Sequence, residues 1–98
     1  MTKSIMQEDS TSCFLCGRNG NGDPLELHHC FPGNPNRKHS DEDGLVVWLC
    51  GNRCHRNGNM SAHKSAVTAE LLKAEAQKAY EDRHTREAFV QRYGKNYL

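Results

Sequence analysis

Four cysteines occur in two closely spaced pairs, at the spacing of a zinc site. The first pair has the pattern Cys-x2-Cys and the second the pattern Cys-x3-Cys; they are Cys13, Cys16, Cys50 and Cys54. Thiolates are soft ligands, and four of them form the tetrahedral shell that structural zinc prefers. We therefore predict one structural Zn²⁺ that joins two distant parts of the chain. The remaining cysteine, Cys30, falls outside both pairs and is expected to be a small buried residue or a bystander.

Histidines gather near the same segments and indicate a second kind of chemistry. His28 and His29 end the run Leu-Glu-Leu-His-His, His55 directly follows the last paired cysteine, and His63 lies shortly after it. One imidazole can hold a metal ion while its neighbour takes a proton from water, because the imidazole pKa lies near neutral pH. Successive residues of a strand face opposite sides, so adjacent histidines share a site only where the strand twists or ends. Phe31-Pro32-Gly33 provides such an end.

A short hairpin is expected to position these groups. Leu25–His29 alternates apolar and polar residues, and Leu45–Leu49 is an apolar run with β-branched and aromatic side chains. We predict that the two form antiparallel strands across a polar loop over 34–43. Residues 50–55 are expected to enter a helical turn, and residues 61–65 to bring His63 back toward the other histidines.

The rest of the chain carries helix signals. Thr68 is a suitable N-cap for a first helix, and Thr85 for a second helix that ends at Gly94. The faces at helical spacing are Leu72, Ala76, Ala79, Tyr80 and Arg83 in the first helix and Phe89, Val90 and Tyr93 in the second. Neither helix carries a convergent set of ligands, so both are expected to pack against the metal-binding core and orient it. The predicted fold class is α+β, a small zinc-stapled hairpin and short helix followed by C-terminal helices.

A chain of 98 residues with 36% apolar side chains is expected to form one small domain that needs a staple such as zinc. We divide it into a flexible or loosely docked arm over 1–12, a zinc-bound core over 13–65 and a helical extension over 66–98. No apolar run approaches the ~20 residues of a membrane span, and the first segment, with Glu8 and Asp9, is too polar for a signal peptide. A cytoplasmic location, where thiols stay reduced, is therefore expected.

The net charge of +1 does not by itself indicate a nucleic-acid partner. The distribution of charge is more informative, because no acidic residue lies between Asp43 and Glu70, and Arg37-Lys38-His39 forms a second basic cluster. Such patches beside a metal site could hold a phosphate backbone. An ordinary solvated face has the same composition and is the simpler interpretation from charge alone.

The combination of these motifs resembles the HNH endonucleases. The shared pattern is Cys-x2-Cys, then Leu-Glu-Leu-His-His, then Leu-Val-Val-Trp-Leu-Cys-x3-Cys-His, over about residues 13 to 64. The chain is more narrowly similar to small HNH-type proteins encoded by phages and prophages, and this similarity reaches the C-terminus. The segments that carry it are His28-His29, Asn36-Arg37-Lys38, Ser40, Gly44-Leu45, Cys54-His55, His63, Thr85-Arg86-Glu87-Ala88-Phe89 and residues 93–98.

The resemblance implies a ββα-metal finger and a one-metal nuclease that acts on DNA in the cytoplasm of a bacterial host. His28 and His55 match the family's metal ligands, and His29 matches the general base that activates water. A bound divalent ion would neutralise charge on the scissile phosphate and stabilise the leaving 3′ oxygen, which gives 5′-phosphate and 3′-hydroxyl ends. Histidine ligands would admit Mn²⁺, Ni²⁺ or Zn²⁺ as well as Mg²⁺.

The chain departs from the family pattern at two positions. The asparagine that fixes the general base has no equivalent near Asp43, so either Asp43 or Asn36 is expected to take that role. A further ligand four residues past His55 would be Asn59, which is a poor metal ligand. His63 is the preferred third ligand, because a turn at Gly58 would place it near His55.

Two hypotheses from different classes follow. The first is a metal-dependent endonuclease that hydrolyses DNA phosphodiester bonds, with His29 as general base and a divalent ion held by His28, His55 and His63. The second is a catalytically inactive zinc module that binds DNA or a partner protein. Because no base-reading element stands out in the sequence, low sequence specificity is expected in either case.

Overall fold

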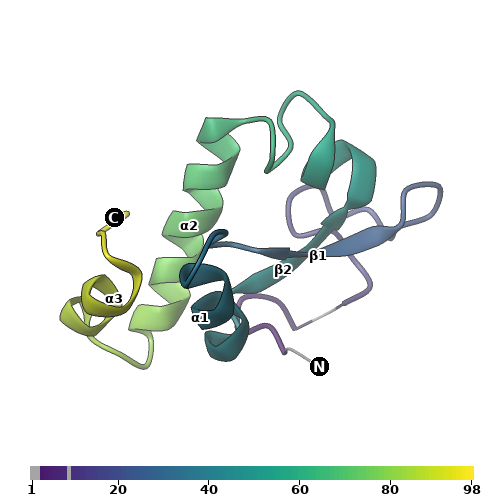
Figure 1. The fold of residues 1–98 in the computed structure, drawn as a ribbon. Coiled ribbons are helices and arrows are strands. Elements are labelled where there is room, and N and C mark those ends of the chain that lie inside the picture. Colours follow the sequence, from purple (N-terminus) through teal and green to yellow (C-terminus); the bar gives the residue numbers. More distant parts are fainter. Residues whose placement is uncertain (1–2, 9) are drawn as a thin grey trace.

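The computed structural model describes residues 3–8 and 10–98 and shows a mixed α+β fold built on a two-stranded hairpin (Figure 1). β1 spans Leu25–His29 and β2 spans Val46–Cys50. The strands are antiparallel, with Leu25 opposite Cys50 and His29 opposite Val46. The predicted hairpin and the predicted fold class are therefore confirmed.

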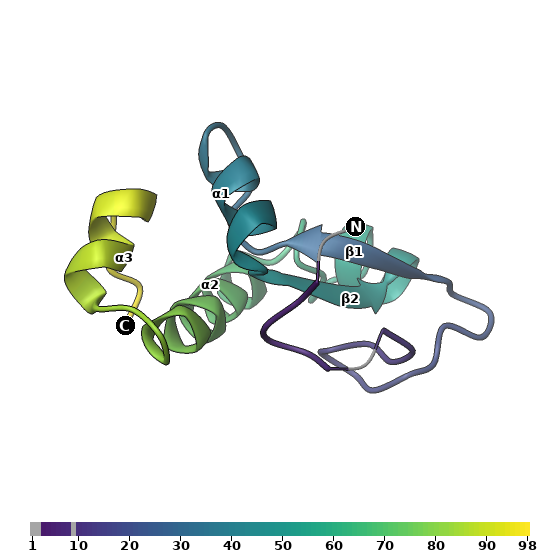
Figure 2. The same ribbon diagram turned by 90° about the horizontal axis from the view of Figure 1, so that it is seen from below.

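The described part of the N-terminal arm, predicted to be flexible or loosely docked, lies along β2 (Figure 2). The amide of Ile5 donates to the carbonyl of Gly44 at 2.9 Å, and the side chain of Gln7 accepts from the amide of Trp48 at 2.9 Å. These bonds satisfy a backbone group of β2 and one in the segment just before it. The other arm residues, Met1, Thr2 and Asp9, lie outside the described part of the chain.

The segment between the strands contains a helix where a polar loop over 34–43 was predicted. α1 spans Asn36–Asp43 and has no apolar stripe. Its buried residue is Ser40, whose hydroxyl donates to the carbonyl of Leu45. Gly44 ends the helix at φ 74°, a left-handed conformation in which a side chain would be strained. Polar contacts with the rest of the molecule stabilise this helix. The spacing of apolar residues in the sequence therefore could not predict it.

After β2 the chain turns at once into a short π-helical segment, η1, which spans Gly51–Arg56. A side chain at Gly51 would meet the carbonyl oxygen of Pro24 at 2.9 Å, so glycine lets η1 lie against the start of β1. The predicted helical turn is confirmed, and it carries the last paired cysteine and the histidine after it. The chain leaves η1 through Gly58, where a Cβ would collide with the carbonyl of Arg53.

α2 spans Ala66–Glu81 and begins earlier than predicted. Its N-cap is Ser65, whose hydroxyl accepts from the amide of Thr68 at 3.1 Å. Thr68 therefore lies inside the first turn, where it is buried, and is not the cap. Arg83, predicted to continue the packing face, lies beyond the end of the helix and is exposed. The predicted face is otherwise correct, with Leu72, Ala76 and Tyr80 buried and Ala79 partly buried.

α3 spans Arg86–Tyr93 and has the predicted ends. The hydroxyl of Thr85 accepts from the amide of Ala88 at 3.1 Å, and Gly94 ends the helix in the left-handed conformation. Of its predicted inward face, Phe89 and Tyr93 are buried and Val90 is partly buried. Among the described residues, no helix has both the length and the apolar character needed to cross a membrane.

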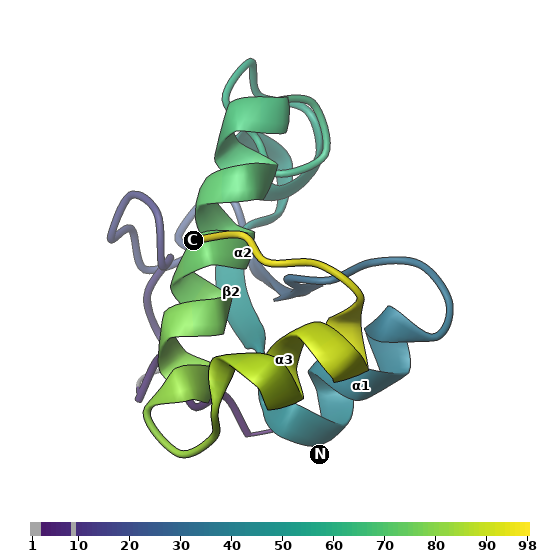
Figure 3. The same cartoon turned by 90° about the vertical axis from the view of Figure 1, so that its left-hand side faces the viewer.

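The core lies where the hairpin, α2 and α3 meet. Phe31, just after β1, packs on Phe89 and Tyr93, with ring centroids 5.6 and 4.6 Å apart. Figure 3 shows α3 beside α1 and the C-terminal tail returning toward α2. The buried side chain of Gln77 accepts from the amide of Tyr97 at 2.7 Å, which fixes this tail. The C-terminal helices thus pack on the hairpin, as expected, and α3 also contacts α1.

Candidate functional site

The four paired cysteines come together at one end of the hairpin. Cys13 and Cys16 lie before β1, Cys50 ends β2, and Cys54 lies in η1. Their sulfur atoms all lie within 4.8 Å of one another, and those of Cys16 and Cys50 are 3.5 Å apart. Tetrahedral zinc with sulfur ligands at about 2.3 Å requires sulfur separations of about 3.8 Å. The cluster could therefore hold a metal ion such as zinc.

The turn between the first two cysteines is shaped around their sulfurs. Gly17 adopts φ 78°, and the amide of Cys16 lies 3.5 Å from the sulfur of Cys13. Burial opposes ionisation of Cys16, but hydrogen bonds from the backbone and side chain of Arg18 outweigh it and lower the pKa of this thiol to about 6. Burial raises the pKa of Cys50 to about 11. A metal ion bound to the sulfurs would favour the ionised form of the Cys50 thiol.

Cys30 does not belong to this cluster, as expected. It is buried after β1, with its sulfur 3.7 Å from the sulfur of Met6. Burial raises the pKa of the Cys30 thiol to about 12, so the group keeps its proton at neutral pH. A protonated buried thiol is an inert core side chain.

Three histidines form a second cluster, and they are the three that the sequence analysis assigned to one ion. His28 on β1, His55 on η1 and His63 in the following turn each offer a ring nitrogen within 4.8 Å of the other two. The Nε2 atoms of His55 and His63 are 3.1 Å apart. Metal–nitrogen bonds of about 2.1 Å require nitrogen separations of about 3.4 Å in a tetrahedral site. These imidazoles could therefore hold a divalent ion.

The turn after η1 brings the third imidazole to the cluster. The amide of His63 donates to the carbonyl of His55 at 3.0 Å, which places their side chains together. Asn59, at the position where the resemblance places a ligand, instead lines a different hollow beside Cys16 and Cys54. The geometry thus favours His63 over Asn59 as the third donor.

Burial keeps the imidazoles of His28 and His63 in the protonation state that a metal ligand needs. Burial, reinforced by the neighbouring His55 and His63, lowers the pKa of His28 to about 3. Burial also lowers the pKa of His63. A neutral imidazole has a free lone pair, so both rings can bind a metal ion at neutral pH without first losing a proton.

Glu26 orients one of these imidazoles, and the sequence analysis missed it. Its Oε1 accepts from Nδ1 of His55 at 2.8 Å and pairs with Nε of Arg56 at 3.0 Å. The bond from His55, with the nearby Arg56, lowers the pKa of Glu26. With the proton on Nδ1, the lone pair of His55 lies on Nε2, which faces the cluster. The signal was available, because Glu26 and His28 are two residues apart on one strand and share a face.

His29 lies beside the cluster rather than in it. Its Nε2 is 3.0 Å from Oδ1 of Asp41, and its side chain is 13% exposed. A carboxylate only accepts, so Nε2 carries the proton and the lone pair lies on Nδ1. His29 and the clustered imidazoles line one cavity of about 240 Å³. The other residues that line it are Leu27, Pro32 and Arg37.

The structure corrects the residue expected to hold His29. Oδ2 of Asp43 accepts from the hydroxyl of Tyr93 and from Nε of Arg92, both at 2.6 Å, so this carboxylate binds α3. Asn36, the alternative, donates to the backbone carbonyl of Tyr93 at 3.2 Å. Both residues attach α1 to α3, and neither forms the contact with His29.

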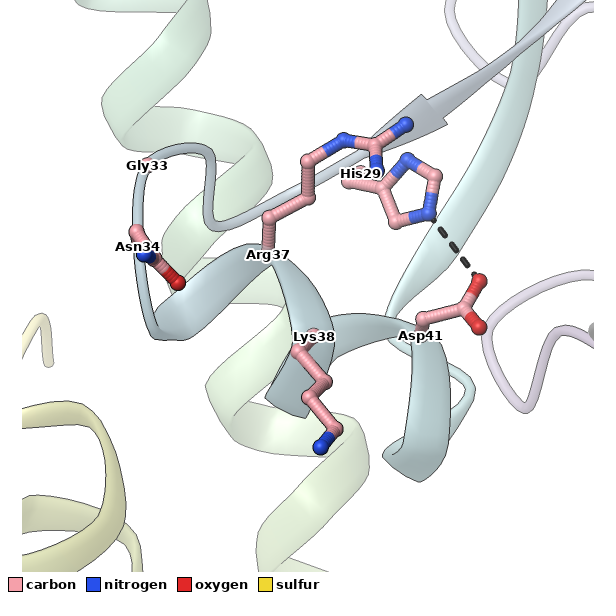
Figure 4. Close-up of a pocket in the computed structure, with 6 residues that line it drawn as sticks. All are labelled: His29, Gly33, Asn34, Arg37, Lys38 and Asp41. Carbon is pink, nitrogen blue, oxygen red and sulfur yellow. Dashed lines mark hydrogen bonds and ion pairs between the residues drawn. The ribbon is translucent and has the colours of Figure 1, made fainter.

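Asp41 takes that position instead. Figure 4 shows it reaching His29 from α1, with Arg37 one turn earlier on the same helix. The sequence analysis missed Asp41 because residues 34–43 were expected to be a loop. On a helix, residues four apart lie on one face, and this spacing would have linked Arg37 with Asp41.

In comparisons with known proteins, no family model, no curated protein and no solved structure matched this chain. The chemistry of the two clusters is therefore the guide to function. Four thiolates complete a tetrahedral shell, which is typical of a structural ion. An ion held by three imidazoles would keep a position open for water or substrate, as catalytic ions do in other proteins.

Proposed function

We propose that the protein is a metal-dependent endonuclease of the HNH type that hydrolyses phosphodiester bonds of DNA. The observation that supports this most strongly is that His29, held by Asp41, borders the same cavity as the imidazoles of His28, His55 and His63. Hydrolysis of a phosphodiester with one metal ion needs a general base and an open metal position that face the same space.

In this mechanism His29 takes a proton from water through Nδ1, because Nε2 is engaged by Asp41. The water oxygen forms a bond to phosphorus, and the bond from phosphorus to the 3′ oxygen breaks. The leaving oxygen takes a proton from solvent, so the ends are a 5′-phosphate and a 3′-hydroxyl. Asp41 stabilises the imidazolium that His29 becomes.

A divalent ion held by the three imidazoles would neutralise charge on the phosphate and on the leaving oxygen. Mn²⁺, Ni²⁺ and Zn²⁺ suit imidazole ligands, and Mg²⁺ is the remaining candidate, although it favours oxygen ligands. Glu26 would fix His55 in the tautomer and ring orientation that such an ion needs.

The four-cysteine cluster has a structural part in this proposal. It connects the turn before β1 with the end of β2 and with η1. His28 and His55 stand on elements that this connection joins, so zinc in the cysteine cluster would hold their separation constant.

Plasmid nicking tests the endonuclease. Zinc-loaded protein with Mn²⁺ or Mg²⁺ should convert supercoiled plasmid into the nicked form. His29→Ala should lower the rate by at least about 100-fold, the usual contribution of a general base, with zinc content unchanged. His84→Ala, which alters an exposed histidine between α2 and α3, is the matched control and should nick at the original rate.

Two results would contradict the proposal. Nicking by His29→Ala at the rate of the control would remove His29 as the base. If the protein nicks no DNA with Mg²⁺, Mn²⁺, Ni²⁺ or Zn²⁺ but binds DNA in a salt-sensitive way, the inactive zinc module is favoured.

A further inference from the structure

We infer, on the basis of the endonuclease function proposed above, that Arg37 binds a second phosphate of the nucleic acid, next to the one that is cleaved. The substrate that the site recognises is then a polynucleotide strand. An isolated phosphodiester has the phosphate that is cleaved but not the second phosphate that Arg37 would bind. Lys38 adds attraction at longer range.

A second hollow adjoins the histidine cavity. It has a volume of about 570 Å³ and lies between the end of β1 and α1 (Figure 4). The residues that line it are His29, Gly33, Asn34, Arg37, Lys38 and Asp41. His29 and Arg37 line both hollows, so the two spaces meet at these side chains. A strand whose scissile phosphate lies at the imidazoles would pass Arg37 as it continues into the second hollow.

Arg37 and Lys38 are exposed, and within residues 3–8 and 10–98 no carboxylate forms an ion pair with either of them. Arg56 and Arg92 differ from these two, because each forms an ion pair with a carboxylate. A guanidinium presents a planar fork of donors that matches two oxygens of one phosphate. Arg37 therefore has both the charge and the donor geometry for a backbone phosphate.

Asp41 is the acidic side chain in the lining of this hollow, and its charge opposes an anion there. Its Oδ1 is engaged by His29, and two cations, Arg37 and Lys38, line the hollow beside this one carboxylate. Figure 4 shows the guanidinium of Arg37 extending toward His29, whereas the amine of Lys38 points away from that ring. Arg37 is thus the cation placed to contact a phosphate close to the cleaved bond.

Two substrates test this assignment. A DNA oligonucleotide carries neighbouring phosphates, whereas bis(p-nitrophenyl) phosphate is a phosphodiester with none. In Arg37→Gln, kcat/KM for DNA should fall about 10-fold or more, the usual effect of losing a direct phosphate contact, and should fall several times less for the small diester. Arg83→Gln, which alters an exposed arginine after α2, is the matched control and should change neither value.

A binding measurement gives a readout that does not depend on catalysis. Fluorescence anisotropy of a labelled duplex with zinc-loaded protein, without added divalent ions, gives the slope of log K against log salt. One lost phosphate contact lowers this slope by about 0.9. Arg37→Gln should show that decrease, and Arg83→Gln should retain the original slope.

Equal losses on both substrates would overturn the inference, because Arg37 would then act on the cleaved phosphate itself. Values for Arg37→Gln that match the Arg83→Gln control in both measurements would overturn it as well. If the unaltered protein hydrolyses neither substrate with any ion, the endonuclease proposal fails, and the salt slope alone decides whether Arg37 holds a phosphate.

Discussion

The carboxylate of Asp41 lies 3.0 Å from Nε2 of His29 and joins α1 to the last residue of β1. This contact leaves Nδ1 of the ring as its basic nitrogen, in a side chain that borders the histidine cavity. The helix between the strands therefore contributes directly to the candidate site, although its sequence has no feature of a packed helix.

Asp41→Asn should lower kcat for DNA nicking about 100-fold, with a smaller effect on KM. The amide lacks the negative charge that stabilises an imidazolium and can hold the ring in the other tautomer. Glu42→Gln is the matched control, because Glu42 is the next residue of α1 and pairs with Arg92 instead. Equal kcat values for the two variants in steady-state nicking assays would contradict the orienting role of Asp41.

Asp43→Asn should affect stability more than catalysis. Its carboxylate accepts from Tyr93 and Arg92, and hydrogen bonds to a charged group contribute about 1.5–3 kcal/mol. We expect a decrease of that order in the free energy of unfolding, measured by urea denaturation of the zinc-loaded protein. Asp82→Asn, at an exposed position after α2, should leave it unchanged. A loss of kcat as large as that of Asp41→Asn, with no loss of stability, would reverse the roles assigned to the two residues.

The hairpin and the cysteine cluster could be predicted from the sequence because their signals are local. Leu25–His29 alternates apolar and polar residues, as a half-buried strand does. Where thiols stay reduced, cysteine pairs at this spacing usually bind a metal ion. The ends of α3 were also readable, since Thr85 and Gly94 are strong capping residues.

α1 and its contacts could not be predicted in this way. The helix is held by hydrogen bonds to residues far along the chain, such as Tyr93. The spacing of apolar residues does not predict such bonds. The start of α2 was misplaced for a different reason. Ser65 and Thr68 are both good N-caps, and local preference does not choose between them when three residues separate the two.

Glu26→Gln should weaken metal binding at the histidine cluster. The bond from His55 to Glu26 fixes the ring, and loss of such a partner usually lowers metal affinity about 10–100-fold. Titration of zinc-loaded protein with Ni²⁺ by calorimetry measures this affinity. Glu75→Gln is the matched control, because Glu75 is a partly exposed acid on α2 that pairs with Lys78. Unchanged Ni²⁺ affinity in Glu26→Gln would show that His55 is not a ligand or is oriented by other groups.

Removal of one cysteine ligand should release the structural zinc and unfold the hairpin. Cys54→Ser should lower zinc content by one ion per chain and abolish a cooperative unfolding transition, because binding of such an ion is coupled to folding. Cys30→Ala alters a buried thiol outside the cluster and should keep its zinc. Metal analysis and circular dichroism measure both effects. Zinc retained in Cys54→Ser but lost from Cys30→Ala would contradict the proposed ligand set.

His28 should make the stability of the protein depend on pH in a defined direction. Burial lowers its pKa to about 3 in the folded protein, against 6.5 for an unperturbed histidine. Above 6.5 the ring is neutral in both states, and the folded state has its full stability. As the pH falls from 6.5 toward 3, His28 becomes protonated in the unfolded chain but stays neutral in the folded chain. The free energy of unfolding therefore falls by on the order of 1 kcal/mol per pH unit.

The matched variant for this effect is His28→Gln, which has no titrating ring. Urea denaturation between pH 7.5 and 5, with one equivalent of zinc for the cysteine cluster, should show a steeper loss of stability in the unaltered protein. Loss of zinc from the cysteines at low pH contributes equally to both proteins, so the difference between their slopes reports His28. Identical slopes, or an NMR titration of the His28 ring with a midpoint near 6.5, would show that the ring is solvated and would remove the buried ligand on which the metal cluster depends.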